Sequence, residues 1–181
     1  MIYEYINLIL GLVKVVLYKI FYFSRISFCS LPKMNWNFKI AIKKGSKLKI
    51  GKNFKTRNNM SFRIYNKGKV KIGNNCFFND NCSINCQQNI EIGNNLICGP
   101  NVMFFDHDHD YKNDIYDFVR NDIKIGNNVW LGADCIILRG VTIGDNVVVA
   151  AGTIIRSNID SNSVVYQRKE TIIKQKKIGD K

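Results

Sequence analysis

The chain has 181 residues, of which 46% are hydrophobic and 23% are charged, a composition that excludes an intrinsically disordered chain. This length predicts one domain, or one domain with an appendage. The formal net charge of +13 suggests anionic partners, such as nucleotide phosphates, nucleic acid or a membrane surface, although a solvated coat of lysines explains the charge as well. No recognised motif supports nucleic-acid binding, so we expect none.

Residues 1–30 are strongly apolar and predict an amphipathic N-terminal helix. Their longest uncharged run, Tyr5 to Val13, is well short of the ~20 residues that span a bilayer. The absence of a basic leading region and of a small-residue cleavage site argues against a secretory signal. The helix would either pack on the rest of the protein or lie in a membrane interface, and the sequence leaves both open. Polar or weakly apolar residues form a narrow stripe along it, at intervals of three and four: Glu4, Asn7, Gly11, Lys14, Tyr18, Tyr22 and Arg25.

A six-residue repeat follows residues 31–49, which read as a linker and a lead-in strand. The period fits neither a helix, at about 3.6 residues per turn, nor a simple strand, at about 2. It is typical of a parallel β-helix, in which stacked coils bury the repeated positions in one continuous core. We therefore expect a β-helix domain over residues 50–166 and a basic tail over residues 167–181. The repeat is clearest where an aliphatic residue returns at every sixth position: Ile125, Leu131, Ile137, Ile143, Val149 and Ile155.

Several cysteines occupy interior positions of the repeat. Cys76, Cys82 and Cys135 each follow an apolar repeat residue by four positions, and Cys98 also falls in phase. At such positions a free thiol acts as a small apolar filler, and buried reduced thiols fit a cytoplasmic protein. Cys82 and Cys86 have no second ligand pair, so we expect no zinc site.

A polar, acidic segment, residues 106–122, interrupts the repeat and predicts a protruding loop. Long loops pushed out of a regular solenoid often carry function. The chain has two histidines, His107 and His109, and both lie in this loop. If the segment is extended, alternate residues share a side, so both imidazoles could face one cleft.

The hexads and the histidine-bearing loop together resemble the hexapeptide-repeat acyltransferases over about residues 70–160. The similarity is closest to the branch that holds galactoside, maltose and nodulation acetyltransferases and the O-acetyltransferases of capsule and lipopolysaccharide sugars. The resemblance implies a left-handed parallel β-helix, although parallel crossovers in general are right-handed. It also implies a homotrimer that transfers an acetyl group from acetyl-CoA to a sugar hydroxyl of a surface polysaccharide or its precursor. We expect a cytoplasmic enzyme, either free or peripheral at the inner face of the cell membrane through residues 1–30.

In this family one loop histidine is the general base and lies at a cleft between two subunits. The match falls on His107, with His109 as the alternative. A sugar hydroxyl needs a base at its proton, and imidazole titrates near neutral pH, so it can accept that proton and return it to the leaving thiolate. One of the loop aspartates would orient the imidazole, and Asp106 is also a candidate for binding the acceptor. Asn79 matches a family asparagine that hydrogen-bonds the acceptor, although stabilising a turn explains it equally well.

The resemblance places acetyl-CoA along the repeat. Trp130 would lie beside the pantetheine channel, the backbone N–H of Ala133 would bind the thioester oxygen, and the backbone at Ala151 would meet the pantetheine arm. Arg156 and Arg168 would supply cations for the CoA phosphates. The Gly-Asn-Pro-Ala-Lys-like turn of many relatives is absent here, which leaves the adenine contacts open.

Three functions compete with O-acetylation. N-acetylation of an amino-sugar nucleotide would use the same base and donor site, and a non-catalytic assembly module would not bind CoA. The metal-dependent carbonic anhydrase built on this scaffold needs three histidines, which this chain lacks. The alternate aspartates of the loop have the spacing of a calcium site without its glycine and distal glutamate, so we expect no metal there: Asp106, Asp108 and Asp110.

Overall fold

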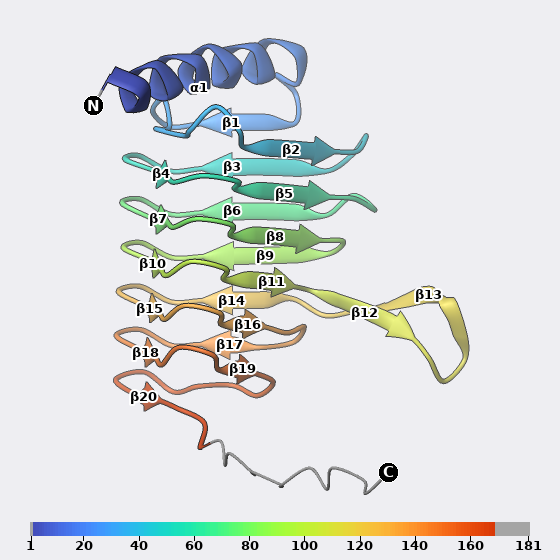
Figure 1. The fold of residues 1–181 in the computed structure, drawn as a ribbon. Coiled ribbons are helices and arrows are strands. Elements are labelled where there is room, and N and C mark those ends of the chain that lie inside the picture. Colours follow the sequence, from blue (N-terminus) through green and yellow to red (C-terminus); the bar gives the residue numbers. More distant parts are fainter. Residues whose placement is uncertain (1, 169–181) are drawn as a thin grey trace, which may run out of the picture.

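A computed structural model describes residues 2–168 as a parallel β-helix with one helix across its N-terminal end (Figure 1). The helix is α1 (Ile2–Phe21). Most of the predicted basic tail, residues 169–181, lies outside the described part of the chain. Among the described residues, no helix has both the length and the apolar character needed to cross a lipid bilayer.

Three six-stranded sheets form the sides of the coil, and all strand pairs within them are parallel. The first sheet contains β1 (Ile26–Phe28), β3 (Lys47–Ile50), β6 (Lys69–Ile72), β9 (Asn89–Ile92), β14 (Ile123–Ile125) and β17 (Thr142–Ile143). The second sheet contains β4 (Lys55–Thr56), β7 (Phe77–Phe78), β10 (Ile97–Cys98), β15 (Trp130–Leu131), β18 (Val148–Val149) and β20 (Val164–Val165). The third sheet contains β2 (Lys39–Ile42), β5 (Ser61–Ile64), β8 (Ser83–Cys86), β11 (Met103–Phe105), β16 (Ile136–Ile137) and β19 (Ile154–Ile155).

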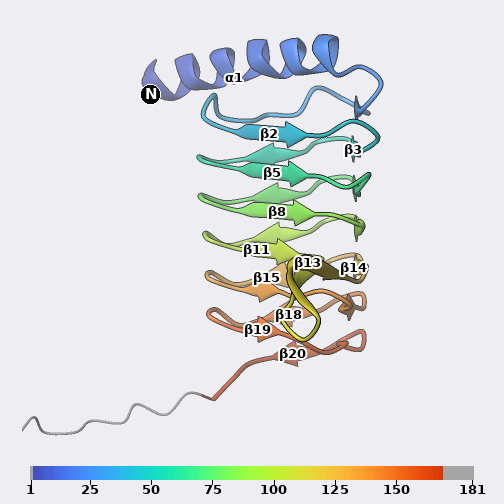
Figure 2. The same cartoon turned by 90° about the vertical axis from the view of Figure 1, so that its right-hand side faces the viewer.

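The coil is left-handed. In Figure 1 the strands of the nearer third sheet point to the right and those of the farther first sheet point to the left, while the chain descends from α1. Figure 2 shows the same stack turned by 90°, with α1 across its N-terminal end and the coils in the same order below it. The predicted fold class is therefore confirmed, with the hand that the family resemblance implies.

The interior of the coil is filled by the repeat positions that the sequence singles out, all of which are buried. Strand β6 shows the pattern, because Lys69 and Lys71 point outward while Val70 and Ile72 point inward. Cys76, Cys82, Cys98 and Cys135 are buried as predicted, and burial raises the pKa of Cys98 well above its usual range, so this thiol stays neutral in the core. Four phenylalanine rings pack against one another inside the coil at tilted angles, with neighbouring centroids 5.5 to 6.4 Å apart: Phe54, Phe62, Phe78 and Phe104.

Asparagines turn one corner of the coil and link it to the coils above and below. Each takes a positive φ, between 55° and 60° at Asn53, Asn75, Asn95 and Asn128, which asparagine tolerates better than most residues. The side-chain amide of one donates to the side-chain oxygen of the next at 2.8 to 3.1 Å. The resulting amide ladder runs the length of the stack: Asn53, Asn75, Asn95, Asn128, Asn146 and Asn162.

The solenoid begins earlier than the sequence predicts. A helix over the whole of residues 1–30 is too long, because α1 ends at Phe21 and β1 pairs with β3, Ile26 opposite Leu48. Residues 31–49, predicted as a linker and a lead-in strand, contain two strands, β2 and most of β3. These strands bury every second residue, but neither leads into the Gly-Asn-Asn sequence of the later corners, since Lys43-Lys44-Gly45 follows β2 and Gly51-Lys52-Asn53 follows β3.

The narrow stripe of α1 faces the solenoid, and the apolar faces of the helix point away from it. Asn7, Gly11 and Val15 are buried there, with Gly11 directly against the Met34 carbonyl, where a Cβ atom would collide. The Lys14 ammonium donates to the carbonyl oxygens of two residues in the first coil, at 2.8 and 2.6 Å: Trp36 and Phe38. Burial and then the nearby Lys39 charge lower the pKa of Lys14 from its usual value.

The amide ladder predicts a measurable cost at its midpoint. Asn95→Ala removes both ladder bonds and places alanine at a φ of 60°, so we expect it to lower the free energy of unfolding by about 1–3 kcal/mol. Asn95→Gly loses the same bonds without the backbone strain, so it should cost less. Denaturant unfolding of both variants measures the difference. Equal losses would mean that the positive φ contributes nothing.

Candidate active site

The segment that interrupts the repeat is an antiparallel hairpin, formed by β12 (His107–Asp110) and β13 (Asp114–Arg120). It leaves the coil after β11 and projects from the side of the stack (Figures 1 and 2). Its ends meet where the Asn121 N–H donates to the Asp106 carbonyl oxygen at 2.9 Å. Strand β11 still pairs with β16 of the next coil, Met103 opposite Ile136, so the insertion leaves the stacking intact.

His107 lies at the base of this hairpin and is held by a buried carboxylate. Its Nδ1 is 2.8 Å from Oδ1 of Asp106, which has no exposed side-chain surface, whereas the His107 side chain is 15% exposed. The backbone N–H groups of Gln87 and Gln88, one coil earlier, donate to the two oxygens of the same carboxylate at 2.8 Å each. The ring of Phe118 on β13 meets the imidazole edge-on, with centroids 5.3 Å apart.

The charge of Asp106 determines which imidazole nitrogen is free. Burial alone would raise the pKa of Asp106, but the hydrogen bonds from His107 and from the Gln87 and Gln88 amides outweigh it and hold the pKa below its usual value. An ionised carboxylate can only accept, so in the neutral imidazole of His107 the proton sits on Nδ1 and Nε2 keeps its lone pair. This is the tautomer that a general base requires. With its oxygens occupied and its side chain buried, Asp106 fits the orienting role better than contact with an acceptor.

His109 lies on the same side of β12, but its surroundings differ. Its Nδ1 is 2.6 Å from the carbonyl oxygen of Ile115 within the hairpin, and its ring packs on Phe118 with centroids 4.5 Å apart. The side chain is exposed and no carboxylate backs it among the described residues. The geometry therefore favours His107 as the base.

Two arginines tie the hairpin to the coil, and the sequence did not point to either. Arg139 donates to Asp108 at 2.9 Å, and Arg120 donates to the side chain of Gln87 at 3.1 Å. Isolated basic residues on a basic chain give no signal of such a role. Both contacts restrain the direction in which the hairpin leaves the solenoid.

Three of the five predicted donor residues meet on the outside of the second sheet. A mostly apolar groove of about 610 Å³ is lined there by Trp130, Ala133 and Ala151, together with Asn79. Trp130 is 54% exposed and pairs with Ile97 on the adjacent strand. The structure thus brings together four of the predicted site residues, which lie up to 72 positions apart in the sequence.

Glycines keep the floor of this groove open. A Cβ atom on Gly99 would lie 2.6 Å from the Ala133 nitrogen, and one on Gly132 would lie 2.6 Å from the Ala151 nitrogen. Any side chain at these positions would therefore cover the two backbone amides that the family resemblance assigns to the donor. Gly99 and Gly132 are functional candidates that the sequence analysis missed, although each follows a repeat residue, Cys98 and Leu131, as a visible signal.

The remaining predicted residues lie elsewhere or have a second role. Arg156 and Arg168 are exposed but do not line the groove. Asn79 lies in the groove, yet its side-chain oxygen accepts from the Asp80 N–H at 2.8 Å, so it also stabilises a turn. Within residues 2–168 no cluster of three or more histidine, cysteine or acidic side chains could hold a metal ion.

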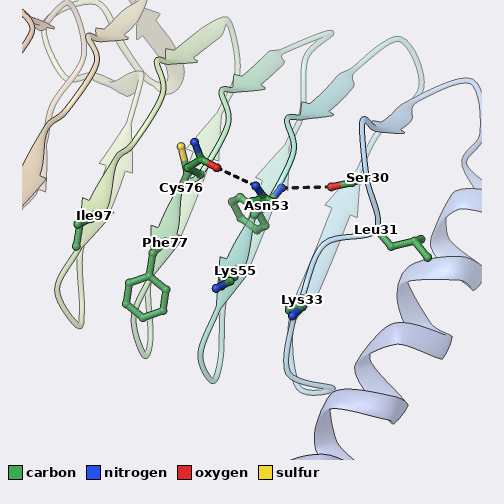
Figure 3. Close-up of a pocket in the computed structure, with 10 residues that line it drawn as sticks. Ser30, Leu31, Lys33, Asn53, Lys55, Cys76, Phe77 and Ile97 are labelled. Atoms are coloured by element: carbon green, nitrogen blue, oxygen red, sulfur yellow. Dashed lines mark hydrogen bonds between the residues drawn. The ribbon is translucent and has the colours of Figure 1, made fainter.

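A cationic cavity continues the groove toward α1. It has a volume of about 620 Å³ and shares Phe77 and Ile97 with the groove. Figure 3 shows Lys33, Lys55, Phe77 and Ile97 on successive coils, with their side chains on the same side of the sheet. The outer column of the second sheet therefore changes from positively charged near α1 to apolar at Trp130.

The imidazole and the groove lie on opposite sides of one chain. In Figure 1 the second sheet forms the left edge of the stack and the hairpin projects on the right. No hairpin residue lines the groove. A site that uses both needs the groove of another copy.

Comparison with known proteins agrees with this architecture. Residues 122–157 match the family model described as bacterial transferase hexapeptide (six repeats). The chain is 38% identical over 101 residues to the galactoside O-acetyltransferase of Escherichia coli, an alignment that covers 52% of this chain and 48% of that protein. It is 26% identical over 150 residues to a putative lipopolysaccharide biosynthesis O-acetyl transferase of Escherichia coli, covering 76% of each.

A solved structure shares the coil. The structure of a galactoside acetyltransferase in complex with coenzyme A is 26% identical, with a TM-score of 0.51, and the match covers 78% of this chain and 59% of that one. The chain spans about half the length of the first curated relative it matches. In its stacked hexads, its family-model match over residues 122–157 and these relatives, the chain is similar to the hexapeptide-repeat acyltransferases.

Proposed function

We propose that this protein is an acetyl-CoA-dependent O-acetyltransferase that acts on a sugar hydroxyl of a surface polysaccharide or its precursor. The observation that carries the proposal is the buried, ionised Asp106, which holds His107 in the tautomer of a general base. Relatives named galactoside and lipopolysaccharide O-acetyltransferases support the reaction and the class of acceptor. Five buried free thiols suit a reducing cytoplasm.

The proposed reaction is a direct transfer. Nε2 of His107 takes the proton of the acceptor hydroxyl while the hydroxyl oxygen attacks the thioester carbonyl carbon. The C–S bond then breaks, and the imidazolium returns the proton to the CoA thiolate. Asp106 stabilises the imidazolium, and the N–H of Ala133 stabilises the negative charge that develops on the thioester oxygen.

The groove would hold the donor. Its apolar surface at Trp130 suits the pantetheine arm, and the small residues at Gly132 and Ala151 allow that arm to approach the backbone. Lys33 and Lys55 extend the groove with positive charge that suits phosphate groups of a nucleotide- or lipid-linked acceptor. Arg156 and Arg168 stay predicted partners of the CoA phosphates, and Asn79 stays a predicted acceptor ligand.

We infer a homotrimer, because the imidazole of one copy would complete its site with the groove of the next. Such a head-to-tail arrangement closes into a ring in which every copy contributes both halves. N-acetylation of an amino-sugar nucleotide is the alternative reaction. An acceptor panel that contains hydroxyl and amino sugars separates the two.

Replacement of the base tests the mechanism. His107→Asn should lower kcat by about 10²–10⁴-fold, because no group remains to take the hydroxyl proton. The asparagine amide can still donate to Asp106, so the melting temperature should change little. The matched control, His109→Asn, should retain activity within a few fold. Acetyl transfer from acetyl-CoA to a sugar panel measures both, and loss of activity in the control alone would assign the base to His109.

Blocking the groove tests the donor site. Ala151→Leu adds three carbon atoms to the groove floor and should raise the KM for acetyl-CoA about tenfold or more. It should also remove the rise in melting temperature that CoA gives to the native protein. Val164→Leu, on the same sheet but outside the groove, is the control and should behave as wild type. A CoA-induced rise that survives Ala151→Leu would place the donor elsewhere.

Mixed oligomers test the shared site. A trimer assembled from equal amounts of His107→Asn and Ala151→Leu chains should contain some intact sites. Such a site forms wherever the His107 of an Ala151→Leu chain faces the unblocked groove of a His107→Asn chain. Random mixing predicts about one quarter of the wild-type rate, although each variant alone is nearly inactive. If both halves of the site came from one chain, mixing would restore nothing.

A further inference from the structure

We infer that α1 binds an anionic membrane surface through its outward apolar face, an interaction that the proposed reaction does not require. Large apolar side chains cover this face, and a contiguous exposed patch of this kind marks an interaction site. Ile9, Val13 and Ile20 are 60%, 52% and 61% exposed. The face also includes further exposed residues along the helix: Tyr5, Ile6, Leu10, Leu12, Val16, Leu17 and Phe21.

The orientation of α1 is fixed by the opposite face, so the apolar side chains have no place on their own solenoid. Gly11 lies against the Met34 carbonyl, closer than any side chain would permit, and Lys14 donates to two carbonyl oxygens of the first coil. Rotating the helix to bury Ile9 or Val13 would break these contacts. Residues 2–168 therefore leave the apolar face of α1 without a partner.

The charge of the neighbouring coils identifies that partner. Residues 1–72, which comprise α1 and the strands from β1 to β6, hold 16 lysines and arginines and one acidic residue. Residues 73–181 hold 11 basic and 13 acidic residues. Exposed lysines stand in register on the first sheet next to α1, with Lys47 beside Lys69 and Lys49 beside Lys71. Anionic headgroups attract such a surface, whereas a second copy that presented the same end would be repelled.

The shape of this end fits a lipid surface. The helix lies flat across the top of the stack (Figures 1 and 2), so its whole outward face can enter the interface of a bilayer at once. An apolar groove of about 290 Å³ opens beside it, lined by Leu8, Leu12 and Leu31, and offers space for part of an acyl chain. Coils spaced by about 4.8 Å place the first two within about 10 Å of α1, close enough for their lysines to feel the surface charge.

The resulting orientation bears on the acceptor, and this step rests on the proposed function. With α1 in the interface, the coil axis stands along the membrane normal, and the hairpin with His107 lies on the order of 20 Å from the lipid. A site at that height suits a sugar that is anchored to the membrane by a lipid.

Vesicle binding of the 181-residue chain tests the inference. The native chain should sediment with phosphatidylcholine vesicles that contain one third phosphatidylglycerol. Its affinity for pure phosphatidylcholine vesicles should be lower by about tenfold or more. The triple variant I9E/V13E/I20E should lose about tenfold or more of the anionic-vesicle binding, because charges would enter the interface. The matched control I9L/V13L/I20L should bind as the native chain does. High salt should weaken native binding.

The outcomes separate the alternatives. Sedimentation of the glutamate variant equal to native, or no native binding to either vesicle, would overturn the inference. So would a glutamate variant that only dissociates larger assemblies in light scattering, because the partner would then be a second copy. Circular dichroism checks that the variants are folded. Acetyl transfer to a water-soluble sugar should be unchanged in the glutamate variant. If the native chain binds vesicles but transfers no acetyl group to any sugar, the proposed reaction is refuted and the membrane inference stands.

Discussion

The stacking of each coil on the next is the interaction on which the rest of this structure depends. A single coil has too few side chains to bury its own apolar residues. In the stack, the inward aliphatic side chains of each coil are buried against those of the coil before it and the coil after it. Burial of one such side chain is worth about 1.5–3 kcal/mol. The spacing must be uniform for this to work, and the corners enforce it. A Cβ atom at Gly93 would lie 2.6 Å from the Gly126 carbonyl oxygen, so the chains at this corner approach as closely as backbone allows.

The same regularity creates both halves of the candidate site. The small residues Gly99, Gly132 and Ala151 follow strands of the second sheet on successive coils. They leave a groove because no long side chain fills the space beside Phe77 and Trp130. The hairpin is tolerated because it leaves and rejoins the coil at one corner, Asp106 to Asn121. Its histidine is nevertheless placed with respect to the rigid coil, since the carboxylate of Asp106 is held by backbone amides of the preceding coil. A buried, fully bonded carboxylate is a more rigid support than an exposed one.

The N-terminal end of a β-helix is an open sheet edge, and such edges present unpaired backbone groups. Helix α1 covers this edge with its more polar stripe, because carbonyl oxygens have to be satisfied there. Lys14 reaches two of these oxygens, and Gly11 lets the helix approach a third residue, Met34. The usual expectation that the apolar face of a surface helix packs on its own protein is therefore reversed here.

The sequence by itself determined the six-residue period, the residues that fill the core, the position of the insertion and the presence of both histidines in it. These features are local or strictly repeated, so they can be read from spacing alone. It predicted one lead-in strand within residues 31–49, where the structure has β2 and most of β3, and it extended the helix past Phe21 over the residues of β1. Only the tertiary structure decided which aspartate supports His107, which face of α1 points outward, and that Trp130 and His107 lie on opposite sides of one chain. These depend on contacts between residues in different coils, such as Asp106 with Gln87, and on how many residues each coil contains, which no local pattern specifies.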